Sequence, residues 1–498
     1  MKYISTRGGN LSVTSAFAIK QGLSPNKGLF MPEKIPSVEL SFIESLTSLS
    51  YEERAAKILS LFLEDFSYEE LLTDAVAAYS KEKFGSSPAP VRDIGDNISV
   101  LELWHGPTSA FKDMALQIMP RLFSRSIKKC GEDRKAIILV ATSGDTGKAA
   151  LEGYRDAEGV AVKVFYPTDG VSAMQKRQMQ TQEGDNLSVS GIYGNFDDAQ
   201  SALKEIFASE EFSRELDKRG FFLSSANSIN FGRLAPQIVY YFSAYADMCK
   251  GGSITLGDKI DVTVPTGNFG NIFAAFIAKE MGLPIDKLIC ASNENDVLTE
   301  FFRTGRYNRL RPFYQTTSPS MDILISSNLE RLIYLTLGAE RCRYLMNDLS
   351  EKGEYTLTKE ELKTVRRSFL GYSTSEKEGA EIMRRTFEDK KYLIDTHTAV
   401  ALSAAMRYMN DYKAENRMLV VSTATPYKFA RDTLYAVFGE SADDIEAVNK
   451  LNELSGVEIP YPIKSLYGKP LIHTGIISKE EMWESTLKLV ERINTPLA

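Results

Sequence analysis

Two stretches of the chain repeat one pattern, in which an apolar run, a polar glycine-containing loop, a helical stretch and a second apolar run follow each other. The first stretch covers residues 136–166 and the second covers residues 260–291. A continuous apolar run such as 136–140 is typical of a strand covered on both faces, and this order of elements builds a parallel sheet. Further strands are expected at 100–104 and 418–421. The sequence therefore predicts an α/β fold with two α/β units.

A different pattern precedes these units. Residues 51–79 place apolar side chains at helical spacing, and a Gly- and Pro-containing stretch at 85–90 then interrupts the chain. With 498 residues the chain is too long for one ordinary domain. We predict a mostly helical N-terminal domain at residues 1–90, a small α/β domain at 91–250, and a large α/β domain with a C-terminal extension at 251–498.

The composition argues against several classes of function. A net charge of −7, from 59 basic and 66 acidic residues without long runs of either sign, argues against a nucleic-acid-binding surface. No apolar run is long enough to cross a bilayer, and the first residues lack the apolar core of a signal sequence. The four cysteines are far apart and the three histidines lack metal-ligand spacing, so we expect a reduced cytoplasmic protein without a metal site. The choice between monomer and homodimer stays open.

Four polar loops follow predicted strands directly. They come after Trp104, Val140, Val264 and Val421. In open α/β sheets, functional sites form at the carboxyl ends of the strands. We therefore expect these loops to line one shared crevice.

Lys112 is the first candidate for chemistry in these loops. It follows the Gly106-Pro107 turn, stands beside Phe111, and precedes residues 114–129, which read as a helix that Pro120 can kink. Most lysines are solvated surface charges. A lysine at a helix start near a sheet edge is instead a candidate for a lowered pKa and for Schiff-base chemistry.

A glycine turn at residues 265–271 is the second candidate. It lies between a predicted strand and a predicted helix, where backbone N–H groups can hold an anion without a basic side chain. A lone turn of this kind is weak evidence, because a tight turn also explains it. Together, an amine for an aldehyde and a turn for a phosphate suggest pyridoxal phosphate as the cofactor.

These motifs in combination resemble the threonine synthases. The resemblance rests on the setting of Lys112 in residues 105–113, on Ala-Thr-Ser-Gly-Asp-Thr-Gly at 141–147, and on Pro-Thr-Gly-Asn-Phe-Gly at 265–270. Asn-Ser-Ile-Asn at 227–230 and Ser-Thr-Ala at 422–424 also match that family. The resemblance runs from the N-terminus to about Phe429.

The resemblance implies fold type II of the pyridoxal-phosphate enzymes, the tryptophan synthase β-like fold. Lys112 would form the Schiff base with the cofactor and then move protons as general base and acid. The cofactor phosphate would be held by Thr266, Gly267, Asn268, Phe269, Gly270 and Asn271. Thr423 would offer its hydroxyl to the pyridine nitrogen. The substrate carboxylate would be bound, or the ring oriented, by Thr142, Ser143, Asp145 and Thr146.

The implied reaction converts O-phospho-L-homoserine and water to L-threonine and phosphate, the last step of threonine biosynthesis. The substrate phosphate needs a cationic site, for which Lys176, Arg233 and Lys428 are the candidates. The family usually has a histidine where this chain has Thr425. A phospholyase that releases phosphate and 2-ketobutyrate is therefore an alternative, and a catalytically silent ligand-binding protein is a third.

Two histidines lie near these motifs. His105 is expected to contact the cofactor edge or to cap its turn. His397 precedes an Ala-rich helix, where N-capping by Thr396 or Thr398 is the preferred interpretation.

Overall fold

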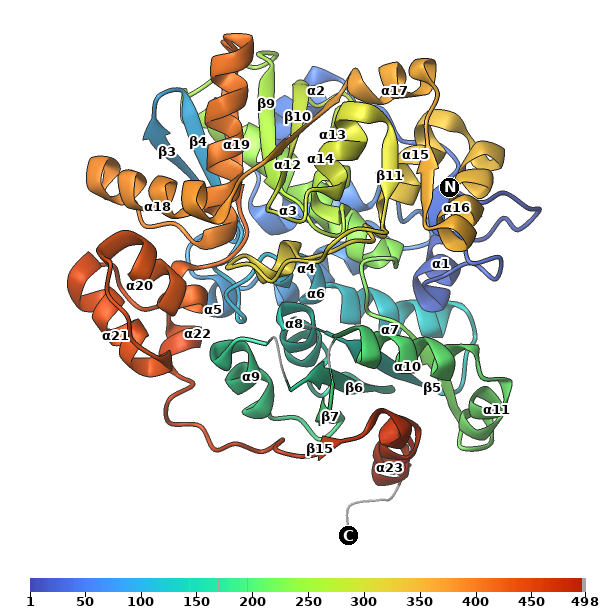
Figure 1. Ribbon diagram of the computed structural model, residues 1–498. Coiled ribbons are helices and arrows are strands. Elements are labelled where there is room, and N and C mark those ends of the chain that lie inside the picture. The colour runs from blue at the N-terminus through green and yellow to red at the C-terminus, as the bar shows by residue number, and fades with distance from the viewer. Residues whose placement is uncertain (143, 169–170, 195, 495–498) are drawn as a thin grey trace.

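Two mainly parallel sheets organise the chain, one above the other in Figure 1. The computed structural model describes residues 1–142, 144–168, 171–194 and 196–494, without the side chains of residues 196 and 197. The larger sheet has the strand order β13-β10-β9-β14-β4-β3, in which all neighbours are parallel except β4 and β3. Its strands are β13 (Phe369–Ser373), β10 (Ile285–Ser292), β9 (Ile260–Pro265), β14 (Arg417–Ser422), β4 (Ile98–Glu102) and β3 (Val91–Gly95).

The smaller sheet is parallel throughout and has the order β15-β7-β6-β5-β8. Its strands are β15 (Ile476–Ile477), β7 (Leu187–Ile192), β6 (Val160–Pro167), β5 (Lys135–Ala141) and β8 (Phe221–Ser224). The central strands β5 and β6 are mostly apolar and are buried along nearly their whole length. The expected α/β fold with two parallel units is confirmed.

Strand pairing crosses the ranges expected for the two α/β domains. β3 and β4 come from residues 91–102 but belong to the larger sheet, where β4 pairs with β14. β15, near the C-terminus, pairs with β7 of the smaller sheet. The ranges 91–250 and 251–498 therefore do not separate the two sheets, because pairing joins segments that are distant in sequence.

The N-terminal part is helical apart from the small antiparallel ribbon of β1 (Tyr3–Ser5) and β2 (Phe30–Pro32). The stretch 51–79, with its helical spacing, forms two helices. Ser50 and Ser67 each begin a helix with a capping box. The serine hydroxyl accepts the N–H of the glutamate three residues later, and the carboxylate of that glutamate accepts the N–H of the serine. The helices are α1 (Ser15–Gln21), α2 (Leu40–Leu46), α3 (Tyr51–Leu59), α4 (Tyr68–Ala78) and α5 (Lys81–Phe84).

The central helices cover the two sheets and meet between them. α12 is buried along most of its twenty residues, and it packs against α3, α6 and α13. This group comprises α6 (Asp113–Leu116), α7 (Met119–Lys129), α8 (Asp145–Tyr154), α9 (Ala173–Gln180), α10 (Phe196–Ala208), α11 (Glu210–Lys218), α12 (Phe231–Lys250), α13 (Gly270–Glu280) and α14 (Val297–Thr304). The single helix expected at 114–129 is instead α6 and α7. Pro120 does not kink a helix but stands in the first turn of α7, where its missing N–H costs nothing.

Most of the remaining elements lie around the larger sheet, and the last ones add a strand and a helix to the smaller sheet. The short strands β11 (Arg306–Asn308) and β12 (Glu354–Thr356) pair with each other. The helices are η1 (Pro319–Met321), α15 (Leu329–Leu337), α16 (Ala339–Lys352), α17 (Lys359–Arg366), α18 (Glu376–Lys390), α19 (Thr396–Tyr412), η2 (Pro426–Phe429), α20 (Ala430–Phe438), α21 (Asp444–Ser455), α22 (Tyr461–Lys464), η3 (Lys479–Glu481) and α23 (Met482–Asn494). The region after Ser441, which carries no readable motif, thus ends as an edge strand and a covering helix.

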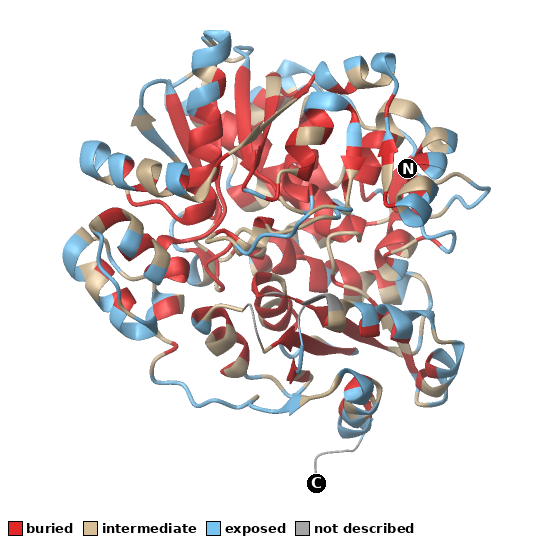
Figure 2. Ribbon diagram, in the orientation of Figure 1, coloured by how far each residue is buried: buried red, intermediate tan, exposed pale blue. Residues whose placement is uncertain are grey.

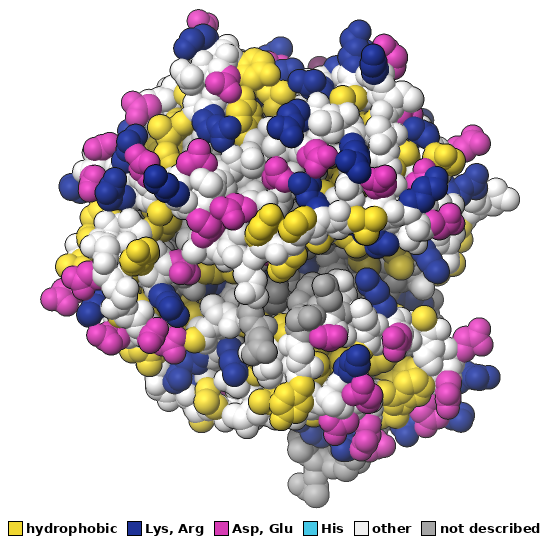
Figure 3. All heavy atoms as spheres, viewed as in Figure 1, with side chains coloured by type: hydrophobic (Ala, Val, Ile, Leu, Met, Phe, Trp, Pro, Cys, Tyr) yellow, Lys and Arg dark blue, Asp and Glu magenta, His cyan; other side chains and the backbone are white. Residues whose placement is uncertain are grey.

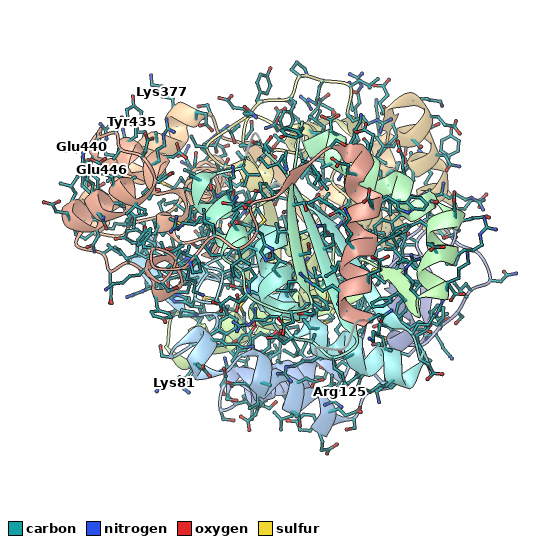
Figure 4. The ribbon with its side chains drawn as sticks, turned by 90° about the horizontal axis from the view of Figure 1, so that it is seen from below. Lys81, Arg125, Lys377, Tyr435, Glu440 and Glu446 are labelled. Atoms are coloured by element: carbon teal, nitrogen blue, oxygen red, sulfur yellow. The ribbon has the colours of Figure 1, made fainter. Side chains whose placement is uncertain are left out.

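Burial and charge follow this architecture. The central strands and the helices between the sheets are buried, whereas the outer helices alternate buried and exposed residues (Figure 2). Basic and acidic side chains are interspersed on the face shown in Figure 3. Lys377, Tyr435, Glu440 and Glu446 gather at one corner, where α20 packs against α18 and α21 (Figure 4). No helix in the described part of the chain is long and apolar enough to span a membrane.

Candidate active site

Lys112 lies between the ends of two neighbouring strands of the larger sheet. It stands at the N-cap of α6, directly after the turn that follows β4. The N–H of Phe111 donates to the carbonyl of Thr423 at 2.8 Å, and Ala110 bridges to Ala424 just beyond β14. This pairing brings Thr423 beside Lys112, although the two are more than three hundred residues apart.

A buried carboxylate and two further cations surround the Lys112 amine. Its Nζ lies 3.8 Å from Oδ2 of Asp145, whose Oδ1 is 2.7 Å from Nζ of the fully buried Lys428. Burial lowers the pKa of Lys112 to about 8; Asp145 opposes this shift, while the charges of Lys428 and Arg233 add to it. Burial would raise the pKa of Asp145, but Lys428 and Lys112 hold it well below its usual range. Lys112 is therefore an amine that loses its proton readily and can act as a nucleophile.

The glycine turn presents its N–H groups on one side. The carbonyl of Gly267 accepts the Ser326 hydroxyl at 2.7 Å, and that of Asn268 accepts the N–H and the side-chain amide of Asn328 at 3.1 and 2.9 Å. In a trans peptide, the next N–H points away from the carbonyl. In the described part of the chain, no backbone acceptor takes the N–H groups of residues 267–269. The turn therefore offers free donors to a ligand.

Phe269 gives this turn its shape. It has a left-handed backbone with φ of 63°, and it is the N-cap of α13. Such a conformation is strained for a bulky residue and needs support from its surroundings. The buried ring packs against Phe369 and Phe302, with centroids 5.5 and 5.9 Å apart, and this cluster supplies the support.

Asn271 adds a side-chain donor to the turn. Its Oδ1 accepts the hydroxyls of Tyr240 and Tyr241 at 2.7 and 2.5 Å, which fixes the amide so that Nδ2 is buried without a partner. Free N–H groups, a buried amide and the start of α13 together fit a phosphate group. The Lys112 amine and this anion site suit the two ends of pyridoxal phosphate. The hydroxyl of Thr266 donates back to the carbonyl of Val264 instead.

The loop before α8 is only partly available to a substrate. The hydroxyl of Thr142 accepts the N–H groups of Gly144 and Gly147 at 3.0 and 3.1 Å, and so holds the start of the helix. Thr146 is half-buried. Ser143 lies outside the described residues. Asp145 is thus the member of this loop whose contacts connect it to Lys112.

The three candidate phosphate-binding cations differ in their surroundings. Lys428 is committed to Asp145 and to the carbonyl of Thr108, which its Nζ reaches at 3.0 Å. Arg233 is buried and donates to the carbonyl of Ala226, but its Nε has no partner and no described carboxylate forms an ion pair with it. Burial lowers the pKa of Arg233 to about 10. Lys176 is half-buried on α9.

The two histidines have clear contacts in the structure, and only the expectation for His397 is tested by them. His105 stacks on Trp104 at 4.2 Å between ring centroids and lies 2.7 Å from Glu102 Oε2. The expectation that Thr396 or Thr398 caps α19 is wrong. Asp395 is the N-cap and accepts from the N–H groups of residues 397 and 398, because its carboxylate is a stronger acceptor than a hydroxyl.

Sequence reasoning missed Arg331, a fully buried guanidinium behind the glycine turn. It donates to Oδ1 of Asn328 and to the carbonyls of Ser228 and Ile229, the latter at 3.2 and 2.5 Å. Asn328 in turn holds the carbonyl of Asn268. The Asn-Ser-Ile-Asn motif is therefore tied through Arg331 to the turn. An arginine on the apolar face of α15, flanked by buried leucines, was the signal available in the sequence.

We expect Arg331→Met to loosen the glycine turn. The change leaves Asn328 and two buried carbonyls without their donor, which costs about 3 kcal/mol of stability and about tenfold in affinity for pyridoxal phosphate. Thermal melting and cofactor titration measure the two effects. Arg341→Met is the matched control, since Arg341 pairs with Glu361 near the surface. An Arg331→Met variant with unchanged cofactor affinity would contradict this role.

Comparisons with known proteins agree with this geometry. Residues 85–424 match the family described as "Pyridoxal-phosphate dependent enzyme", and residues 2–79 match "Threonine synthase N terminus". The chain is thus a pyridoxal-phosphate-dependent enzyme of fold type II. The crystal structure of threonine synthase from Brucella melitensis with bound cofactor is 33% identical and superposes with a TM-score of 0.87, covering 99% of this chain and 100% of that one.

Curated relatives place it within that class. Threonine synthase of Schizosaccharomyces pombe is 35% identical over 86% of this chain and 88% of its own length. The human protein "Threonine synthase-like 1" is 38% identical over 94% of this chain and 62% of its own length. The chain belongs to the threonine synthase family. It spans 62–65% of the length of the threonine synthase-like 1 relatives that it matches.

Proposed function

We propose that the enzyme converts O-phospho-L-homoserine and water to L-threonine and phosphate. The observation that carries the proposal is the Lys112 amine, which lies 3.8 Å from the buried carboxylate of Asp145 and feels the charge of Arg233, a guanidinium without a described carboxylate partner. The named threonine synthases among its relatives support the same reaction. We also propose that it acts in the cytoplasm.

Lys112 is the proposed proton carrier of the reaction. The cofactor, when bound, would draw electrons from the substrate carbons that lose protons. The Lys112 amine would take protons from the α and β carbons as the phosphate leaves the γ carbon. A proton is then delivered to the γ carbon, water adds its hydroxyl at the β carbon, and the α carbon is reprotonated. Asp145 keeps a negative charge beside this amine, and Lys428 holds Asp145 in place. We propose that Thr423 offers its hydroxyl to the pyridine nitrogen, because its backbone lies next to that of Phe111.

Arg233 is the best-supported partner for the substrate phosphate. A buried guanidinium without a carboxylate partner is costly unless an anion neutralises it. Its charge contributes to the lowered pKa of Lys112, which supports a role in the same site. Lys176 stays a second candidate, whereas Lys428 is already paired with Asp145. The hydroxyls of Thr142 and Thr146 and the loop that contains Ser143 are proposed to receive the substrate carboxylate.

Thr425 favours a second candidate function. It is buried, and its N–H donates at 3.3 Å to the carbonyl of Ser109, three residues before Lys112. A hydroxyl here cannot carry a proton at neutral pH as an imidazole can. Without a proton relay for water addition at the β carbon, the enzyme would act as a phospholyase and release phosphate, ammonia and 2-ketobutyrate. A catalytically silent binding protein is less compatible with the amine at Lys112.

We expect the cofactor-loaded enzyme to form threonine and phosphate in equal amounts from O-phospho-L-homoserine, because water addition completes each turnover. Phosphate release and amino-acid analysis measure the two products together. 2-Ketobutyrate in place of threonine would establish the phospholyase instead. Absence of both products, with the cofactor bound, would leave the silent binding protein.

A further inference from the structure

One segment between β11 and α15 contacts both the glycine turn and the Asp145 carboxylate beside Lys112. We call residues 316–328 the bridging segment. Ser326 and Asn328 hold the carbonyls of Gly267 and Asn268. At the other end, the hydroxyl of Ser320 donates to Oδ2 of Asp145 at 3.3 Å. The segment therefore connects the proposed cofactor site to Asp145, the first residue of α8, which follows β5 of the smaller sheet.

The bridging segment is fixed to the larger sheet by a polar network. Oδ1 of Asp322 accepts the hydroxyl of Thr316 at 2.8 Å and the amides of Asn293 and Asn295 at 2.7 and 2.9 Å. Both asparagines directly follow β10. A carboxylate that accepts this many donors has few alternative arrangements. These hydrogen bonds therefore hold the segment in one conformation where it contacts Asp145.

His397 fixes the backbone of Ser320. Oδ2 of Asp395 lies 2.8 Å from His397 Nδ1 and also accepts the backbone N–H of that residue, so the ring proton is on Nδ1. The other ring nitrogen, Nε2, accepts the N–H of Ser320 at 3.2 Å. Both Asp395 and His397 are buried. The position of Ser320 therefore does not depend on its own hydroxyl, and that hydroxyl is free to act on Asp145.

The two oxygens of Asp145 have different partners. Oδ1 takes the Lys428 ammonium at 2.7 Å and the Gln175 amide at 2.8 Å. Oδ2 takes the Ser320 hydroxyl and is also the oxygen nearest to Lys112. A donor on Oδ2 withdraws part of its negative charge from the amine, and it competes with a direct ion pair between Asp145 and Lys112.

We propose that Ser320 is a positioning residue that, through Asp145, makes the Lys112 amine give up its proton more readily. Ser320 need not touch substrate for this effect. The inference rests on the proposed function only in assigning the proton transfers to Lys112.

The test is the pH dependence of Lys112 reactivity in Ser320→Ala. The full-length protein, freed of cofactor, is labelled with a small amine-reactive reagent, and peptide mapping follows the label on Lys112. Without the hydroxyl, Oδ2 attracts the ammonium more strongly, so the labelling midpoint moves up by about half a pH unit and labelling below it slows roughly threefold. The acidic limb of the pH profile of phosphate release by the cofactor-loaded enzyme should move in the same direction.

Two variants separate positioning from a general loss of structure. Ser320→Thr keeps the hydroxyl and should restore the parent midpoint. Ser326→Ala removes a hydroxyl of the same segment that contacts Gly267, and should weaken cofactor binding without moving the midpoint. An unchanged midpoint in Ser320→Ala, or an equal shift in Ser326→Ala, would overturn the proposal. Labelling needs no substrate, so a shifted midpoint in a protein that makes no threonine would count against the proposed function alone.

Discussion

Lys112→Ala should abolish turnover and leave the fold intact. The variant loses the amine that would bind the cofactor and also the base that would move the protons, so kcat should fall by at least about 10⁴-fold. The variant should still fold, because Asp145 keeps its ion pair with Lys428 when Lys112 is replaced. Phosphate release and circular dichroism measure the two properties, and near-normal activity would contradict the assignment.

Two controls sharpen this experiment. Lys112→Arg keeps a positive charge beside Asp145 but cannot form the Schiff base, so it should be as inactive as Lys112→Ala. Lys163→Ala removes another buried lysine, one that donates to Ser188 and Ser190 on β7. Its activity should persist. Borohydride reduction of the cofactor-loaded parent followed by peptide mapping should place the label on Lys112 and on no other lysine.

Gly267→Val should cause the second largest effect, a loss of at least about tenfold in affinity for pyridoxal phosphate. A Cβ at Gly267 would lie 2.6 Å from the backbone carbonyl of Ser320, so the side chain collides with the bridging segment rather than with the anion. The turn must then move, and its N–H groups move with it. Titration of cofactor absorbance measures the effect.

A graded series tests this explanation. Gly267→Ala already places the Cβ in the collision and should be intermediate between the parent and Gly267→Val. Gly468→Val is the matched control, because nothing lies within 4 Å of a Cβ added there. If Gly267→Val bound the cofactor as tightly as the parent, the contact between the turn and the bridging segment would not control the anion site.

Local patterns in the sequence were sufficient for the central strands of the two sheets. The apolar runs at β5, β6, β9 and β14 carry their own signal, because a strand buried on both faces admits few polar residues. The same patterns placed the polar loops at the strand ends. They did not reveal that β3 and β4 belong with β14, or that β15 belongs with β7. Such pairings depend on long-range packing that no local window contains.

The site residues also fall into those that local motifs indicate and those whose roles depend on long-range contacts. Lys112, Asp145 and the glycine turn stand in dense local motifs, and the structure brings the first two within 3.8 Å. Arg331 and Ser320 lie in stretches without a recognisable motif, and their roles come from hydrogen bonds to residues far away in the sequence. Thr142 has a second role that no local pattern reveals, since its hydroxyl also accepts two N–H groups at the start of α8.

The crossed strand pairing described above bears on how this enzyme can be taken apart. A cut between β8 and β9 would leave β3 and β4 on the first fragment, although their partner β14 is on the second. It would also separate β15 and α23 from the sheet that they complete. Neither fragment would contain all the strands of one sheet. We therefore expect the two α/β units to fold together, and each fragment to be unstable when it is produced alone.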